Sequence, residues 1–71
     1  MNSNEKIKYT LKLRDFRKAR EFARSLGLST RSEWDAWCNN NSKTKPKDIP
    51  VLPNVAYKGR GWISYKDWLI G

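Results

Sequence analysis

The 71-residue chain contains no histidine, a single cysteine and no long run of apolar residues. Without histidine, the Ser–His and Cys–His pairs of nucleophilic catalysis cannot form, and the commonest general base is missing. One cysteine cannot close a disulfide within the chain or, without histidine, build a structural zinc site. These absences predict a protein that is not an enzyme, holds no metal or cofactor and takes no small-molecule substrate.

Membrane and export signals are also missing from the sequence. No apolar stretch of about 18 residues could span a membrane, and the first thirty residues are charged throughout, without the apolar core of a signal peptide. A lone unpaired Cys38 fits a reducing environment. We therefore expect an intracellular protein with no membrane partner.

Positive charge and aromatic rings are what the sequence has in excess. Fifteen Lys and Arg against seven Asp and Glu give a net charge of +8, and there are four Trp, three Tyr and two Phe. A positive charge of this size either binds phosphate groups or keeps the protein soluble. A domain this small needs large side chains to build a core. We expect Trp34, Trp37 and Trp68 in that core beside Cys38, and keep Trp62 as a candidate for stacking on bases.

The spacing of apolar residues predicts three short helices. A helix over 16–26 carries its apolar side chains on one face and ends at Gly27. A second, over about 31–39, begins with a capping box at Thr30. The third begins after Ser64, which is followed three residues later by an aspartate. The predicted fold class is mainly α, a small single domain.

The remaining segments carry other patterns. Residues 1–5 show no pattern and are expected to be disordered. Residues 6–14 alternate apolar and basic side chains, which indicates an extended N-terminal arm. Residues 42–61 hold all three prolines together with apolar side chains, and should form an ordered connecting segment. The domain should therefore span 6–71, and an end so soon after Leu69 suggests a piece of a longer protein.

Four blocks follow one another along the chain: Arg24-Ser25-Leu26-Gly27-Leu28, Ser32-Glu33-Trp34, Asp48-Ile49-Pro50 and Gly61-Trp62-Ile63-Ser64-Tyr65. Together they resemble the phage-integrase repeat unit, over about residues 16–69. This resemblance implies an accessory DNA-binding module of phage-type recombination systems, without recombinase chemistry of its own. It also implies a recombinase catalytic domain or neighbouring repeat copies as further partners.

The basic residues supply the candidate contacts. Arg17, Arg20 and Arg24 share one side of the first predicted helix, and three alternating lysines would point the same way from an extended segment. Lys58 and Arg60 flank a turn that contains Gly59 and Gly61, where the missing side chains allow a phosphate to approach closely. The predicted phosphate contacts are Arg17, Arg20, Arg24, Arg31, Lys43, Lys45, Lys47, Lys58 and Arg60.

The predicted function is non-catalytic binding of duplex DNA through these contacts, in site-specific recombination. Two alternatives stay open. One is a protein-interaction or self-assembly module, in which the edge of arm residues 7–13 pairs with another copy. The other is a single-stranded nucleic-acid binder that stacks bases on Trp62.

Overall fold

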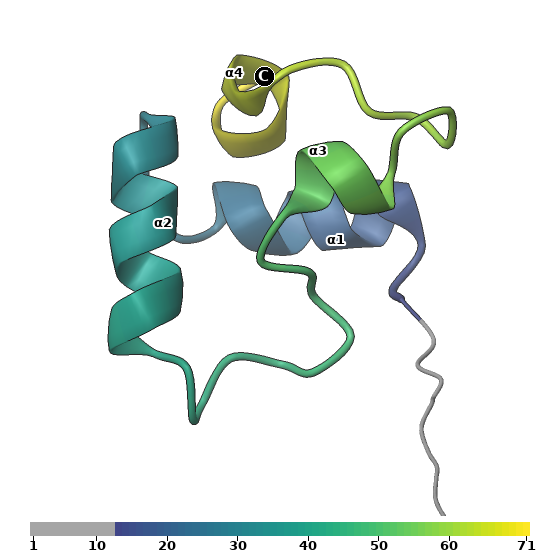
Figure 1. Ribbon diagram of the computed structural model, residues 1–71. Helices are drawn as coiled ribbons and strands as arrows, with labels where there is room; N and C mark the ends of the chain where they lie inside the picture. Colours follow the sequence, from purple (N-terminus) through teal and green to yellow (C-terminus); the bar gives the residue numbers. More distant parts are fainter. Residues whose placement is uncertain (1–12) are drawn as a thin grey trace, which may run out of the picture.

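The computed structural model describes residues 13–71, which form four helices and no strand (Figure 1). The helices are α1 (Phe16–Arg24), α2 (Arg31–Asn40), α3 (Pro53–Ala56) and α4 (Tyr65–Leu69). The prediction of a small, mainly α fold is confirmed. The predicted disorder of 1–5 and the extended arm, apart from its last two residues, lie outside the described residues.

The helix starts follow the local signals in the sequence. The Asp15 carboxylate accepts a hydrogen bond from the backbone of α1. Thr30 and Glu33 form the reciprocal capping box of α2. Ser64 caps α4 by accepting from a backbone N–H, at 3.0 Å. The first helix ends two residues earlier than predicted, before a turn that leads to Gly27 at a left-handed φ of 74°.

The proline-rich segment is ordered, as predicted, but it contains a helix that was not expected. Pro53 is the first residue of α3, a position where its missing N–H leaves no hydrogen bond unmade. Ile49 is buried, and the Trp34 indole N–H donates to the Val51 carbonyl at 2.9 Å. The segment thus runs across the core and returns the chain to α1.

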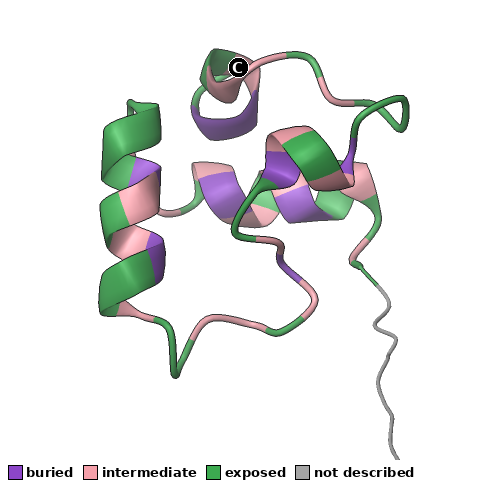
Figure 2. Ribbon diagram, in the orientation of Figure 1, coloured by how far each residue is buried: buried purple, intermediate pink, exposed green. Residues whose placement is uncertain are grey.

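The core is built from aromatic rings packed on two small residues. Trp34 and Trp68 are both fully buried, with ring centroids 5.6 Å apart and planes nearly perpendicular. Trp37 is half-buried and stacks on Trp34. Figure 2 shows the buried positions on the inward sides of the helices. The buried apolar set is Ala19, Ala23, Trp34, Cys38, Ile49, Tyr57, Trp68 and Leu69.

Candidate nucleic-acid interface

Two of the predicted contacts, Arg20 and Arg24, are tied to α4 by one carboxylate. Arg20 Nη1 lies 2.9 Å from Asp67 Oδ2, and Arg24 Nη2 lies 3.2 Å from Asp67 Oδ1. Arg24 also donates to the Asp67 backbone carbonyl, at 2.7 Å. The Asp67 side chain is only 20% exposed. Both guanidiniums therefore hold α1 against α4 and are occupied by an internal partner.

The predicted comb of three lysines is wrong. Residues 41–44 form turns rather than an extended strand, and the Lys45 N–H donates to the Asn41 carbonyl at 2.7 Å. The Lys45 ammonium turns back onto the chain, where it donates to the carbonyls of Pro46 and Ile49. Only Lys43 and Lys47 of the three remain exposed.

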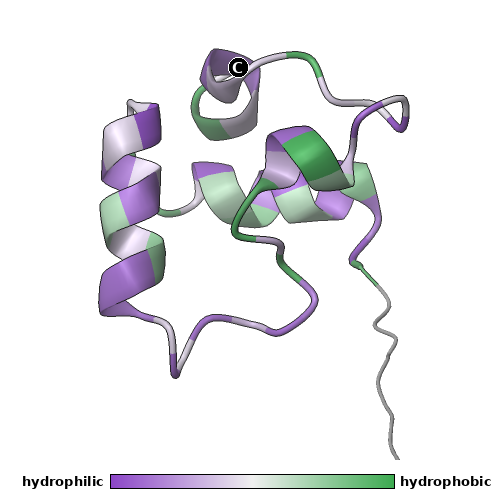
Figure 3. Ribbon diagram, viewed as in Figure 1, coloured by the Kyte–Doolittle hydropathy of each residue, from purple (hydrophilic) through white to green (hydrophobic). Residues whose placement is uncertain are grey.

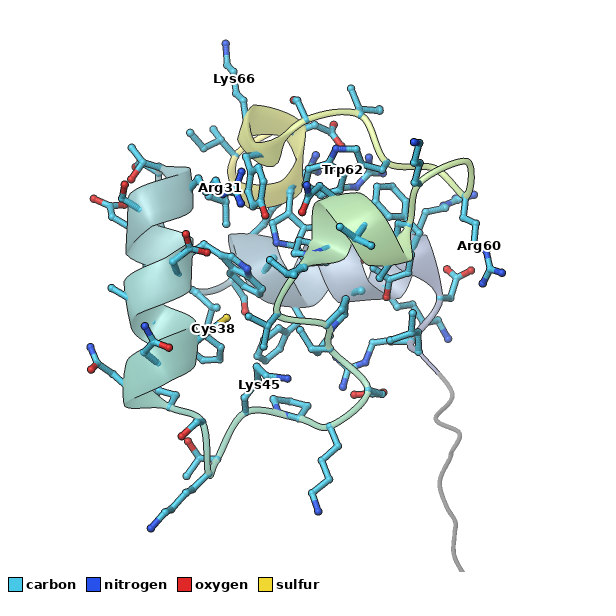
Figure 4. All side chains as sticks on the ribbon, in the orientation of Figure 1. Arg31, Cys38, Lys45, Arg60, Trp62 and Lys66 are labelled. Carbon is cyan, nitrogen blue, oxygen red and sulfur yellow. The ribbon has the colours of Figure 1, made fainter. Side chains whose placement is uncertain are left out.

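Arg31 lies between α2 and α4. Its guanidinium sits 5.0 Å from the centroid of the Tyr65 ring, and its Nε lies 3.7 Å from Asp35 Oδ2, one turn further along α2. Figure 4 shows the side chain directed toward α4. Because the Arg31 and Asp35 side chains are about half exposed, their ion pair adds little stability.

The remaining cations include three that we name the α1-end cluster: Arg17, Lys58 and Arg60. All three are exposed, and none forms an ion pair within residues 13–71. The Tyr57 hydroxyl donates to the backbone carbonyl of Arg14 at 2.6 Å, which fixes the end of α3 beside the start of α1. In Figure 4, Arg60 projects outward at this end of α1.

Another cation near the start of α1, Arg14, is neutralised by the carboxylate of Asp48. Arg14 donates two hydrogen bonds of 3.0 Å to the Asp48 carboxylate, and these hold the pKa of Asp48 below its ordinary value. Lys18, which is not among the predicted contacts, is exposed next to Arg17. Lys18 and Arg17 line one shallow hollow together with two carboxylates. Lys18 is exposed because it lies on the side of α1 that faces away from the core.

Trp62 is packed rather than free. It is half-buried, with its ring centroid 5.0 Å from that of Tyr65 and 5.8 Å from that of Trp68. Figure 4 shows it beside α3 and α4. The exposed large apolar side chains of residues 13–71 include no aromatic ring. The described part of the chain therefore has no freely exposed ring on which a base could stack, and the expectation for Trp62 loses its geometric support.

Comparisons with protein-family models, curated proteins and solved structures return no match to this chain. Within residues 13–71, no group of three or more His, Cys, Asp or Glu could hold a metal ion. No helix in the same stretch is long and apolar enough to cross a membrane. The functional proposal therefore rests on the placement of the residues themselves.

Proposed function

We propose that the protein is a non-catalytic module that binds duplex DNA through phosphate contacts at the α1-end cluster. The observation that carries the proposal is that the turn carrying Lys58 and Arg60 packs against the start of α1, which carries Arg17. The three make no ion pair within residues 13–71, although acidic partners occupy several other arginines. Cations left in water in this way are available to replace the counterions of a phosphate backbone.

The packing of the aromatic residues favours a duplex over a single strand. Proteins that bind single strands stack unpaired bases on aromatic side chains, at about 1–3 kcal/mol per base. The rings of residues 13–71 are instead packed against one another around Trp34 and Trp68. A ligand at the α1-end cluster is therefore held through its backbone charge, and a duplex presents the higher density of phosphate.

The link to recombination rests on the residue blocks that resemble the phage-integrase repeat unit. On that basis the module is an intracellular accessory to a recombinase catalytic domain or to neighbouring repeat copies. The catalytic steps would belong to that other domain.

The test is fluorescence anisotropy of labelled duplex and single-stranded DNA at several salt concentrations. The variant Lys58→Gln/Arg60→Gln removes two charges from the α1-end cluster. Its matched control, Lys43→Gln/Lys47→Gln, removes two exposed charges from the loop after α2. We expect the first double variant to flatten the slope of log K against log salt by about 0.9 per lost contact, and the control to change it much less.

Three results would overturn this reading. Equal losses in both double variants would show that net charge alone, and not this surface, binds the DNA. No binding by the natural sequence at low salt would remove the function altogether. Tighter binding of single strands, lost in Trp62→Ala, would establish the stacking alternative.

A second candidate, a protein-interaction module, is supported by apolar side chains left in water. Val51, Leu52 and Val55 lie at or beside α3 and are 46%, 48% and 65% exposed, and Ile63 is 67% exposed. Figure 3 shows the hydrophobic side of α3 on the outer face of the domain. Exposed apolar groups of this kind are a feature of interaction surfaces. A stable dimer in analytical ultracentrifugation, dissociated by Val55→Lys, together with no DNA binding, would favour this candidate.

A further inference from the structure

The turn that carries Lys58 and Arg60 is pressed against α1 at a single glycine. Gly61 has a φ of 118°, and a Cβ built on it would lie 2.7 Å from Cδ2 and 3.1 Å from Cγ of Phe16. One α-hydrogen of Gly61 therefore points into the Phe16 ring. Because side chains do not approach a ring so closely, this contact requires glycine.

The Phe16 ring cannot easily move aside. Its centroid lies 5.3 Å from that of Tyr57, in an edge-to-face arrangement, and 6.1 Å from that of Trp68. Tyr57 is also joined to the turn, since its carbonyl accepts hydrogen bonds from the backbone N–H groups of Arg60 at 2.8 Å and Trp62 at 3.2 Å. The turn is thus held on both sides of Gly61, against a ring that the core holds in place.

We propose that Gly61 is a positioning residue for the DNA-binding surface: its contact with Phe16 holds Lys58 and Arg60 beside Arg17. Arg17 directly follows Phe16, and Arg60 directly precedes Gly61, so the contact joins the two halves of the α1-end cluster. This inference rests on the proposed function. It adds that the relative placement of the cations, and not only their charge, determines affinity.

The chain offers a control within the same turn. Gly59 also has a left-handed φ, of 73°, but a Cβ there would meet nothing within 4 Å. Gly59→Ala and Gly61→Ala both introduce a methyl group at a positive φ, which strains the backbone, and both keep the net charge unchanged. Only Gly61→Ala also drives a methyl group into Phe16 and pushes the turn away from α1.

The experiment compares duplex affinity and its salt dependence in the two variants, under conditions where tryptophan fluorescence shows both to be folded. For Gly61→Ala we expect a loss equivalent to about one phosphate contact, which is about 8-fold at 0.1 M salt, with a slope flatter by about 0.9. Gly59→Ala strains the same turn without meeting Phe16, so it should lose clearly less affinity than Gly61→Ala. Equal affinities in the two variants would overturn the inference. If Gly61→Ala does not fold, Phe16→Leu removes the ring while keeping the glycine, and should flatten the slope in the same way.

A second measurement separates this inference from the proposed function. In the NMR spectrum of the natural sequence, the Phe16 ring current should displace the chemical shift of one Gly61 α-hydrogen well outside the ordinary glycine range, and Phe16→Leu should return it to that range. Two ordinary Gly61 α-hydrogen shifts in a protein that does bind duplex DNA would overturn the positioning role alone. A displaced α-hydrogen shift in a protein that binds no DNA would instead overturn the proposed function, and with it any role of Gly61 in binding.

Discussion

Asp67 is the acidic group whose loss should weaken the fold most, because it neutralises two arginines of another helix. The substitution Asp67→Asn keeps the size of the side chain and the hydrogen bond from its backbone N–H to Ser64. It removes the negative charge that lies 2.9 Å from Arg20 and 3.2 Å from Arg24. Both guanidiniums then stay in place without a carboxylate, at 23% and 35% exposure.

The size of the effect follows from that partial burial. Breaking a fully buried pair costs about 3–5 kcal/mol, and exposed pairs contribute about 0–1 kcal/mol. A group that is about one-fifth exposed and binds two cations lies between these limits, so we expect a loss of about 2 kcal/mol in the free energy of unfolding. With a urea dependence of about 1 kcal/mol per molar for so small a domain, the midpoint should fall by about 2 M.

The assay is urea unfolding followed by tryptophan fluorescence, and Asp35→Asn is the matched control. It makes the same change of charge at a carboxylate that is 47% exposed and pairs with one arginine at 3.7 Å, so its cost should stay below about 0.5 kcal/mol. Equal midpoints for the two variants would refute the reasoning, since they would show that Asp67 gains nothing from its second arginine and its burial.

Three further predictions concern other contacts. Cys38 is 3% exposed, and burial raises the pKa of its thiol. A thiol reagent should therefore label Cys38 only as fast as the domain opens. Rapid labelling of the native protein would contradict this burial. Arg14 holds the pKa of Asp48 below its ordinary value, so this carboxylate stabilises the fold at higher pH and loses that effect as the pH falls below about 4. In acid titrations, Asp48→Asn should therefore flatten the decline of the free energy of unfolding with falling pH. An unchanged decline would count against the Arg14–Asp48 pair. Tyr57→Phe removes the hydrogen bond to the Arg14 carbonyl. In calorimetry it should lower the thermal midpoint and reduce the free energy of unfolding by about 1 kcal/mol. An unchanged midpoint would mean that water replaces the hydroxyl without loss.

The helix starts could be predicted because their signals are local. An N-cap side chain bonds to a backbone group two or three residues away, so residue types such as Thr30 and Glu33 reveal the arrangement directly. The one helix that was missed, α3, is a single turn that begins at Pro53. Proline both interrupts a helix and begins one, and only the packing of the flanking residues decides which applies.

The candidate site could be predicted only in part, because spacing along one helix shows which side chains share a side but not what faces them. No acidic residue lies four positions from Arg20 or Arg24 along α1. The partner is Asp67, which lies 47 and 43 residues further along the chain. The alternation of lysines predicts an outward-pointing Lys45, yet its ammonium donates to carbonyls that a turn brings within reach. Such long-range and turn-dependent contacts leave no periodic pattern in the sequence.

The short helix α4 makes the domain dependent on the last of its four helices to be synthesised. Its five residues supply two buried side chains, Trp68 and Leu69, and the carboxylate that joins it to α1. During translation, α1 and α2 emerge from the ribosome before α4 does, with the apolar sides of both helices uncovered. The domain can close fully only once α4 has emerged, and a chain truncated before residue 65 should remain sensitive to protease even though most of the domain is present.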